Sequence, residues 1–158
     1  MFVHDFVHIE RKPQDVKAAV LAERGRWLLP LCTTLGGDLR VQVGPASAGT
    51  ARQRFGKDVH VELGEPVEYG DTVVVPMRWE ATGPSRLFPT LDANLEITSL
   101  GMDRTRIGLS GHYRVPLGAV GRKADDWLLH GLAEDTLRAF LQRVRIVLET
   151  DRQAAPAL

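Results

Sequence analysis

The sequence has a single cysteine, Cys32, among its 158 residues, so no internal disulfide bond can form. The absence of disulfides is typical of a reducing compartment, and we expect a cytoplasmic location. The N-terminal segment "MFVHDFVHIERK" lacks the unbroken apolar core of a signal peptide, and no apolar run approaches the length of a membrane span. The sequence therefore predicts a soluble protein without an integral membrane segment.

Neither sign of charge is in excess, because 20 Lys and Arg residues balance 20 Asp and Glu residues. Domains that bind nucleic acid mainly by neutralising phosphates are usually basic. The arginines here are interleaved with acidic residues and form no basic arm. We therefore expect no nucleic-acid partner.

Metal-binding and phosphate-binding motifs are also missing. The sequence contains no HxH, HExxH or CxxC spacing and no glycine pattern of a P-loop. His4 and His8 share one face of a predicted strand, but four residues of strand separate them by roughly 13 Å, too far for one ion. We expect no metal site and no fixed cofactor.

The overall composition is that of an ordinary globular domain, with 44% hydrophobic and 25% charged residues. A chain of this length forms one domain with a substantial core. We place that domain at residues 1–150 and expect a flexible C-terminal tail at residues 151–158, "DRQAAPAL".

The N-terminal third predicts a strand followed by short helices. Residues 2–10 alternate between apolar and polar faces with the period of a strand. Pro13 suits the first turn of a helix. Gly25 and Pro30 divide the following region into two short helices, and Gly36 and Gly37 end it.

From Leu39 onward the period-two alternation dominates and predicts an antiparallel sheet with one apolar face. Pro76 within one of these runs indicates an edge position or a bulge. Residues 45–56 fit either a loop or a ragged hairpin. The predicted strands are residues 39–43, 58–63, 72–80, 91–98 and 106–115.

One long helix is predicted at the C-terminal end, over residues 124–150. Its polar arc contains the (i, i+4) pairs Glu134–Arg138 and Arg145–Glu149. The remaining circumference, which includes Ile146, is apolar and wider than a helix on a flat surface needs. We therefore expect the helix to lie in the concave side of a strongly curved sheet. Small inward-facing residues among large ones permit an apolar cavity there, and a fully packed core is the alternative.

The order of these elements resembles the START-like superfamily, also called SRPBCC or helix-grip proteins, and its polyketide cyclase/dehydrase-like group. The segments "VHIERKPQDVKAAV" and "LSGHYRVPLGAVGRKADDWLLHGLAEDTLRAFL" carry the resemblance, which spans residues 2–150. It implies an α+β fold: a curved antiparallel sheet of about six to seven strands wrapped around a long C-terminal helix, with two short helices after the first strand. It also implies a deep apolar pocket between sheet and helix for a lipid, polyketide or similar molecule.

Residues on the inner faces of these elements are the candidates for ligand binding. The resemblance places the short helices at the pocket mouth, so Trp27 is a candidate for gating it. Trp79 and Tyr113 could stack on or hydrogen-bond to a ligand, or could simply be core. The full set of ligand-binding candidates is Trp27, Met77, Trp79, Leu95, Tyr113, Leu129, Ala133, Thr136, Leu137 and Phe140.

Three residues are candidates for catalysis. Asp126 and His130 are spaced (i, i+4) on the last helix, so the carboxylate could orient the imidazole for general acid–base work. Alternatively, Asp126 is a first-turn residue favoured by the helix dipole and His130 is partly exposed. Asp5 shares a face with Val7 and Ile9 and, if buried, needs a partner such as Arg143 or Tyr113. The alternative is that the first strand is an edge strand with both faces partly exposed to solvent.

The sequence thus predicts a protein that binds a hydrophobic small molecule, and it leaves open cyclase- or dehydratase-like catalysis. The alternative is a structural or protein-interaction domain with a filled core, acting through its surface or as a homodimer.

Overall fold

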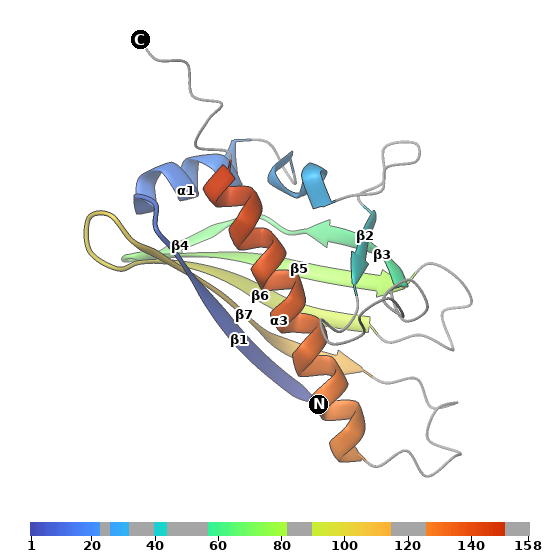
Figure 1. The fold of residues 1–158 in the computed structure, drawn as a ribbon. Helices are drawn as coiled ribbons and strands as arrows, with labels where there is room; N and C mark the ends of the chain where they lie inside the picture. Colours follow the sequence, from blue (N-terminus) through green and yellow to red (C-terminus); the bar gives the residue numbers. More distant parts are fainter. Residues whose placement is uncertain (23–25, 32–39, 44–56, 82–89, 115–125, 151–158) are drawn as a thin grey trace.

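A curved antiparallel sheet lies across one long helix, α3, in the computed structural model of this protein (Figure 1). The structure describes residues 1–22, 26–31, 40–43, 57–81, 90–114 and 126–150. Of residues 40–43, 57, 81, 126–130 and 132 it describes the backbone alone. The arrangement confirms the predicted α+β helix-grip fold.

The elements follow one another in the predicted order. They are β1 (Phe2–Ile9), α1 (Pro13–Leu21), the 3-10 helix η1 (Arg26–Leu31), β2 (Arg40–Val43), β3 (Lys57–Leu63), β4 (Val67–Tyr69), β5 (Thr72–Ala81), β6 (Thr90–Ser99), β7 (Thr105–Arg114) and α3 (Asp126–Thr150). The second short helix is therefore a 3-10 helix, with Pro30 inside it. The three-residue strand β4 was not predicted.

The strands are ordered β1-β7-β6-β5-β3-β2, and β4 pairs with β5 beyond the end of β3. All pairs are antiparallel. Gly70 and Gly101 lie in the turns before β5 and β7 with φ of 54° and 77°, a backbone conformation that favours glycine. Short turns of this kind keep consecutive strands adjacent.

Pro76 lies in β5, between β6 and the β3–β4 segment, and so is not at the edge of the sheet. β3 ends with the pair Leu63–Met77, and β4 resumes pairing at Val67–Val74, so the interruption stands opposite Pro76. The carbonyl of Pro76 accepts a hydrogen bond from the N–H of Gly64 at 2.7 Å. The missing N–H of Pro76 therefore coincides with a break in the ladder of strand pairs.

The buried hydrophobic residues of the described segments form one cluster between the inner face of the sheet and the helices. On β6 every second residue from Leu91 to Ile97 is buried. On α3 the buried positions are Ala133, Thr136, Leu137, Phe140, Leu141, Val144 and Leu148. Ile146 is 62% exposed, so the apolar arc of the helix is narrower than predicted.

Among the described elements, α3 packs most extensively against β1 and then against η1, β7 and β2. Arg11 Nη1 donates to the Leu148 carbonyl at 2.9 Å, and Thr105 Oγ1 donates to the Arg11 carbonyl at 2.8 Å. These bonds fix the C-terminal end of α3 against the segment that follows β1. No helix within the described ranges has both the length and the apolar character needed to cross a lipid bilayer.

Candidate functional site

The inner face of the sheet and α3 bring most of the predicted ligand-binding residues into one interface. Trp79 on β5 and Phe140 on α3 are in edge-to-face contact, with ring centroids 5.4 Å apart and planes at 82°. Thr136 contributes a buried hydroxyl. The other predicted residues that are buried in the same core cluster are Trp27, Met77, Leu95, Ala133 and Leu137.

Tyr113 lies on the inner face of β7, opposite Leu91 of β6, and packs half-buried against the core. Burial raises the pKa of its phenol from 10.0 to about 12. The phenol is therefore protonated at neutral pH and can donate a hydrogen bond.

Trp27 on η1 is only 4% exposed. Its indole nitrogen is buried, and no acceptor for its N–H lies within hydrogen-bond distance in the part of the chain that the structure describes. A buried donor without a partner is uncommon in folded proteins. η1 packs on α3, where Arg143 Nη2 donates to the Leu31 carbonyl at 3.3 Å.

Asp5 points toward α3 on the same face as Val7 and Ile9, as predicted. Its partner is Arg138, whose Nε lies 3.2 Å from Asp5 Oδ2, and neither Arg143 nor Tyr113 takes that place. The other oxygen of Asp5 accepts the backbone N–H of Phe6 at 2.8 Å. Both oxygens thus have structural partners.

Several predictions concern positions outside the described residues. The side chains of Asp126, Leu129 and His130 are among them, so their proposed roles stay predictions. The predictions for residues 45–56 and for the tail at residues 151–158 also lie outside the described residues. No group of three His, Cys, Asp or Glu side chains in the described segments is arranged to hold a metal ion.

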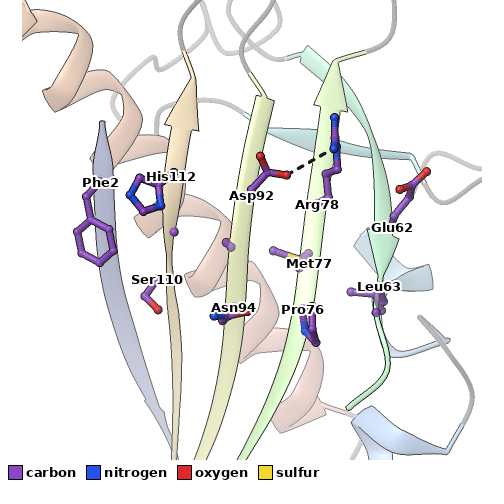
Figure 2. A pocket seen from close by; sticks show the side chains of 13 residues that line it. Phe2, Glu62, Leu63, Pro76, Met77, Arg78, Asp92, Asn94, Ser110 and His112 are labelled. Atoms are coloured by element: carbon purple, nitrogen blue, oxygen red, sulfur yellow. Dashed lines mark ion pairs between the residues drawn. The ribbon is translucent and has the colours of Figure 1, made fainter. Parts of the chain in front are cut away.

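A feature that the sequence did not predict is a hollow of about 590 Å³ on the outer face of the sheet. Figure 2 shows it from that side, with α3 behind the strands. We call it the outer-face hollow. It is lined by Phe2, Glu62, Leu63, Gly64, Pro76, Met77, Arg78, Asp92, Ala93, Asn94, Ser110, Gly111 and His112.

Two rows of residues across the strands produce this shape. Ser110 on β7, Asn94 on β6 and Pro76 on β5 are neighbours, and Gly64, which directly follows β3, continues the row; none has a large outward side chain. The adjacent row has larger side chains, three of them charged: His112, Asp92, Arg78 and Glu62. A row of short side chains beside a row of long ones leaves a trough, and this juxtaposition follows from strand register alone.

Two charged residues of the outer-face hollow, Asp92 and Arg78, pair with each other and with residues outside its lining. Asp92 lies 3.7 Å from Arg78 Nε (Figure 2). Asp92 also lies 3.1 Å from Arg114 Nη2, and Arg78 pairs with Glu80. At one end the ring of Phe2 meets that of His112 edge-to-face, with centroids 5.5 Å apart. The hollow is open to solvent, so its ion pairs are weak.

Solved structures with the same fold cover nearly the whole chain. A START superfamily protein from Mycobacterium smegmatis superposes with a TM-score of 0.55 at 13% identity, covering 98% of this chain and 99% of that one. An aromatase/cyclase from Streptomyces sp. R1128 gives 0.55 at 14% identity and 100% and 99% coverage. Norcoclaurine synthase from Thalictrum flavum, in complex with dopamine and hydroxybenzaldehyde, gives 0.54 at 11% identity and 100% and 89% coverage. No protein-family model and no curated protein matches the sequence.

Proposed function

We propose that this chain, which has the START-like helix-grip fold, binds a hydrophobic small molecule between the inner face of its sheet and α3. The observation that carries the proposal is the composition of that interface. Large aromatic residues, Trp79 and Phe140, and small ones, Ala93 and Ala133, are buried in one cluster with few polar groups. Sites for apolar ligands have this combination of apolar walls and a small number of polar groups.

The similar structures support the same class of ligand. The aromatase/cyclase and the norcoclaurine synthase are enzymes of the same fold, and the latter is in complex with the aromatic molecules dopamine and hydroxybenzaldehyde. At 11% to 14% identity the likeness shows the fold alone, so ligand and chemistry are proposals for this chain.

We infer that any catalysis would be cyclase- or dehydratase-like and would use proton transfer by the Asp126–His130 pair. Asp5 is a weaker candidate, because its carboxylate is engaged by Arg138 and by the N–H of Phe6. Tyr113, protonated at neutral pH, is suited to hydrogen bonding with a ligand oxygen.

The proposal is tested by blocking the interface from the helix side. Ala133 is 3% exposed, and Ala133→Phe would project a ring into the region between α3 and the sheet. We expect it to weaken binding of the uncharged fluorescent probe N-phenyl-1-naphthylamine by at least about tenfold. The control is Ile146→Phe, at a position of α3 that is 62% exposed, where binding should not change.

Circular dichroism would establish that Ala133→Phe is folded, and Ala133→Leu replaces it if it is not. Equal, saturable binding by wild type and both variants would exclude this interface as the site. Native mass spectrometry of protein purified from its own host would then identify any ligand that copurifies.

A second candidate function is protein interaction through the outer face of β1, at the edge of the sheet. Phe2 and Phe6 are 56% and 46% exposed there, and they alternate with His4 and His8. Sedimentation of wild type and Phe6→Ser would test for a homodimer. A monomer at every concentration would remove a second copy of the chain as the partner.

A further inference from the structure

We infer that the indole N–H of Trp27 donates a hydrogen bond to an oxygen of the bound hydrophobic molecule, an inference that rests on the proposed function. Trp27 belongs to the same core cluster as Trp79, Leu137 and Phe140, which are predicted ligand-binding residues. It reaches that cluster from η1, which packs on α3. The residue is therefore part of the interface that we propose for the ligand.

The indole N–H of Trp27 is a polar group of this interface that has no hydrogen-bond partner among the described residues. Its nitrogen is buried, and no acceptor lies within hydrogen-bond distance among the described residues. Leaving such a donor unpaired lowers the stability of the folded state by about 1–3 kcal/mol, because its hydrogen bond to water is lost on folding and no other bond replaces it. A phenylalanine at this position would pack in the core without that penalty.

Other polar groups near the core already have partners. Thr105 Oγ1 donates to the Arg11 carbonyl, and the Asp5 carboxylate faces Arg138. These polar groups have partners within the protein, and the indole N–H of Trp27 is an exception among the described residues. An acceptor supplied from outside the chain accounts for the exception, since burial also shields the nitrogen from solvent.

The chemistry of the donor selects the class of ligand. An indole N–H is a single neutral donor that accepts nothing, so its complement is one uncharged acceptor. A carbonyl or ether oxygen on an apolar body fits, because a carboxylate would bring a charge that a neutral donor does not balance. The ligand that we propose is therefore an apolar molecule bearing one carbonyl-type oxygen, with that oxygen at η1.

A pair of nearly isosteric probes tests the inference. 2-Acetylnaphthalene has a carbonyl where 2-isopropenylnaphthalene has a methylene group, so the two differ mainly in the acceptor. Their dissociation constants would be measured by equilibrium dialysis for wild type and Trp27→Phe. We expect the substitution to weaken binding of the ketone about fivefold to tenfold more than binding of the hydrocarbon. The change in affinity for the hydrocarbon, which has no acceptor, measures the effect of replacing the indole ring by the smaller phenyl ring.

Proton–nitrogen correlation spectra of the wild type provide a readout that does not require the variant to fold. The chain has three tryptophans, so three indole signals are expected. The ketone should move the Trp27 indole proton downfield, as hydrogen bonding does, and the hydrocarbon should not. The signal missing from Trp27→Phe, or labelling of single tryptophans, assigns it.

The outcomes separate the two proposals. If Trp27→Phe weakens binding of the ketone selectively and only the ketone shifts the indole signal, both the proposed function and the donor role of Trp27 are supported. If Trp27→Phe lowers the affinity for both probes equally or not at all, and the ketone causes no specific indole shift, the donor role is overturned. Ligand binding at the interface then still stands. Binding of neither probe, with no indole shift, counts against the proposed function and removes the donor role with it.

Discussion

Arg138 Nε on α3 lies 3.2 Å from Asp5 Oδ2 on β1, so one ion pair connects an edge strand to the long helix. Asp5 Oδ2 is buried, and the contact is an ion pair without the alignment of a hydrogen bond. The Oδ1 atom accepts the N–H of Phe6. That N–H points away from β7, because the odd-numbered positions of β1 make the hydrogen bonds to β7, as Met1 does with Tyr113. Asp5 thus occupies part of the open edge of the sheet, a position where unpaired N–H groups invite aggregation.

The Asp5–Arg138 pair is expected to contribute about 0.5–1 kcal/mol to the free energy of unfolding, since Arg138 is 56% exposed and water screens the interaction. A double-mutant cycle of Asp5→Ala and Arg138→Ala in urea would measure the coupling. Asp135→Asn is the control, because Asp135 contacts the same guanidinium at 3.2 Å from an exposed position and should change stability less. A coupling energy of zero would contradict the assignment of Asp5 to a structural role.

Gly111 is expected to tolerate no side chain. A Cβ atom there would lie 2.3 Å from the Asp92 carbonyl oxygen and 2.5 Å from Ala93 Cα, both backbone atoms of β6. Gly111→Ala should therefore destabilise the protein by about 2 kcal/mol or more. A Cβ atom at Gly131 on α3 would meet nothing within 4 Å, and Gly131→Ala should stabilise by about 0.5–1 kcal/mol. Thermal unfolding of the two variants would show shifts of opposite sign.

Tyr113 should make stability depend on pH in the alkaline range. Its pKa is about 12 in the folded protein because of burial, against 10.0 for an exposed phenol. Between these values the folded state holds a proton that the unfolded state has lost, so stability is fully present below pH 10 and falls as pH rises toward 12. Urea unfolding across this range should show a smaller decline for Tyr113→Phe than for wild type. Identical declines would mean that the phenol is not buried in solution.

Phe140 should be among the more sensitive core positions, because it is 1% exposed and its ring meets Trp79 edge-to-face. Phe140→Ala is expected to cost about 3–5 kcal/mol and to alter the near-ultraviolet circular dichroism of Trp79. Phe2, with 56% of its surface exposed, is the matched control. Phe2→Ala should change stability by less than about 0.5 kcal/mol. Similar losses in both variants would contradict the division of the sheet into an inner and an outer face.

The strands and the long helix could be predicted because burial of one face repeats with a regular period. Burial on β6 alternates from Thr90 to Thr98, and the sequence shows this alternation clearly. β4 was missed because its three residues are all exposed and leave no alternation. Ile146 was misplaced because a helical wheel records hydrophobicity and not the direction from which the sheet approaches.

The details of the sites depend on distances that sequence does not contain. That Asp5 shares a face with Val7 follows from period two, but its pairing with Arg138 depends on where α3 crosses β1. The outer-face hollow depends on a register that places Asn94 beside both Ser110 and Pro76. The buried N–H of Trp27 is equally invisible in sequence, because only the three-dimensional structure shows that no described acceptor lies within hydrogen-bond distance.

The extensive packing of α3 on β1 also has a consequence for biosynthesis. β1 leaves the ribosome early and α3 late, with about 115 residues between the end of one and the start of the other. Until α3 emerges, the apolar face of β1 lacks its main packing partner, so chaperones would bind the nascent chain. Folding would then be governed by contacts between residues distant in sequence.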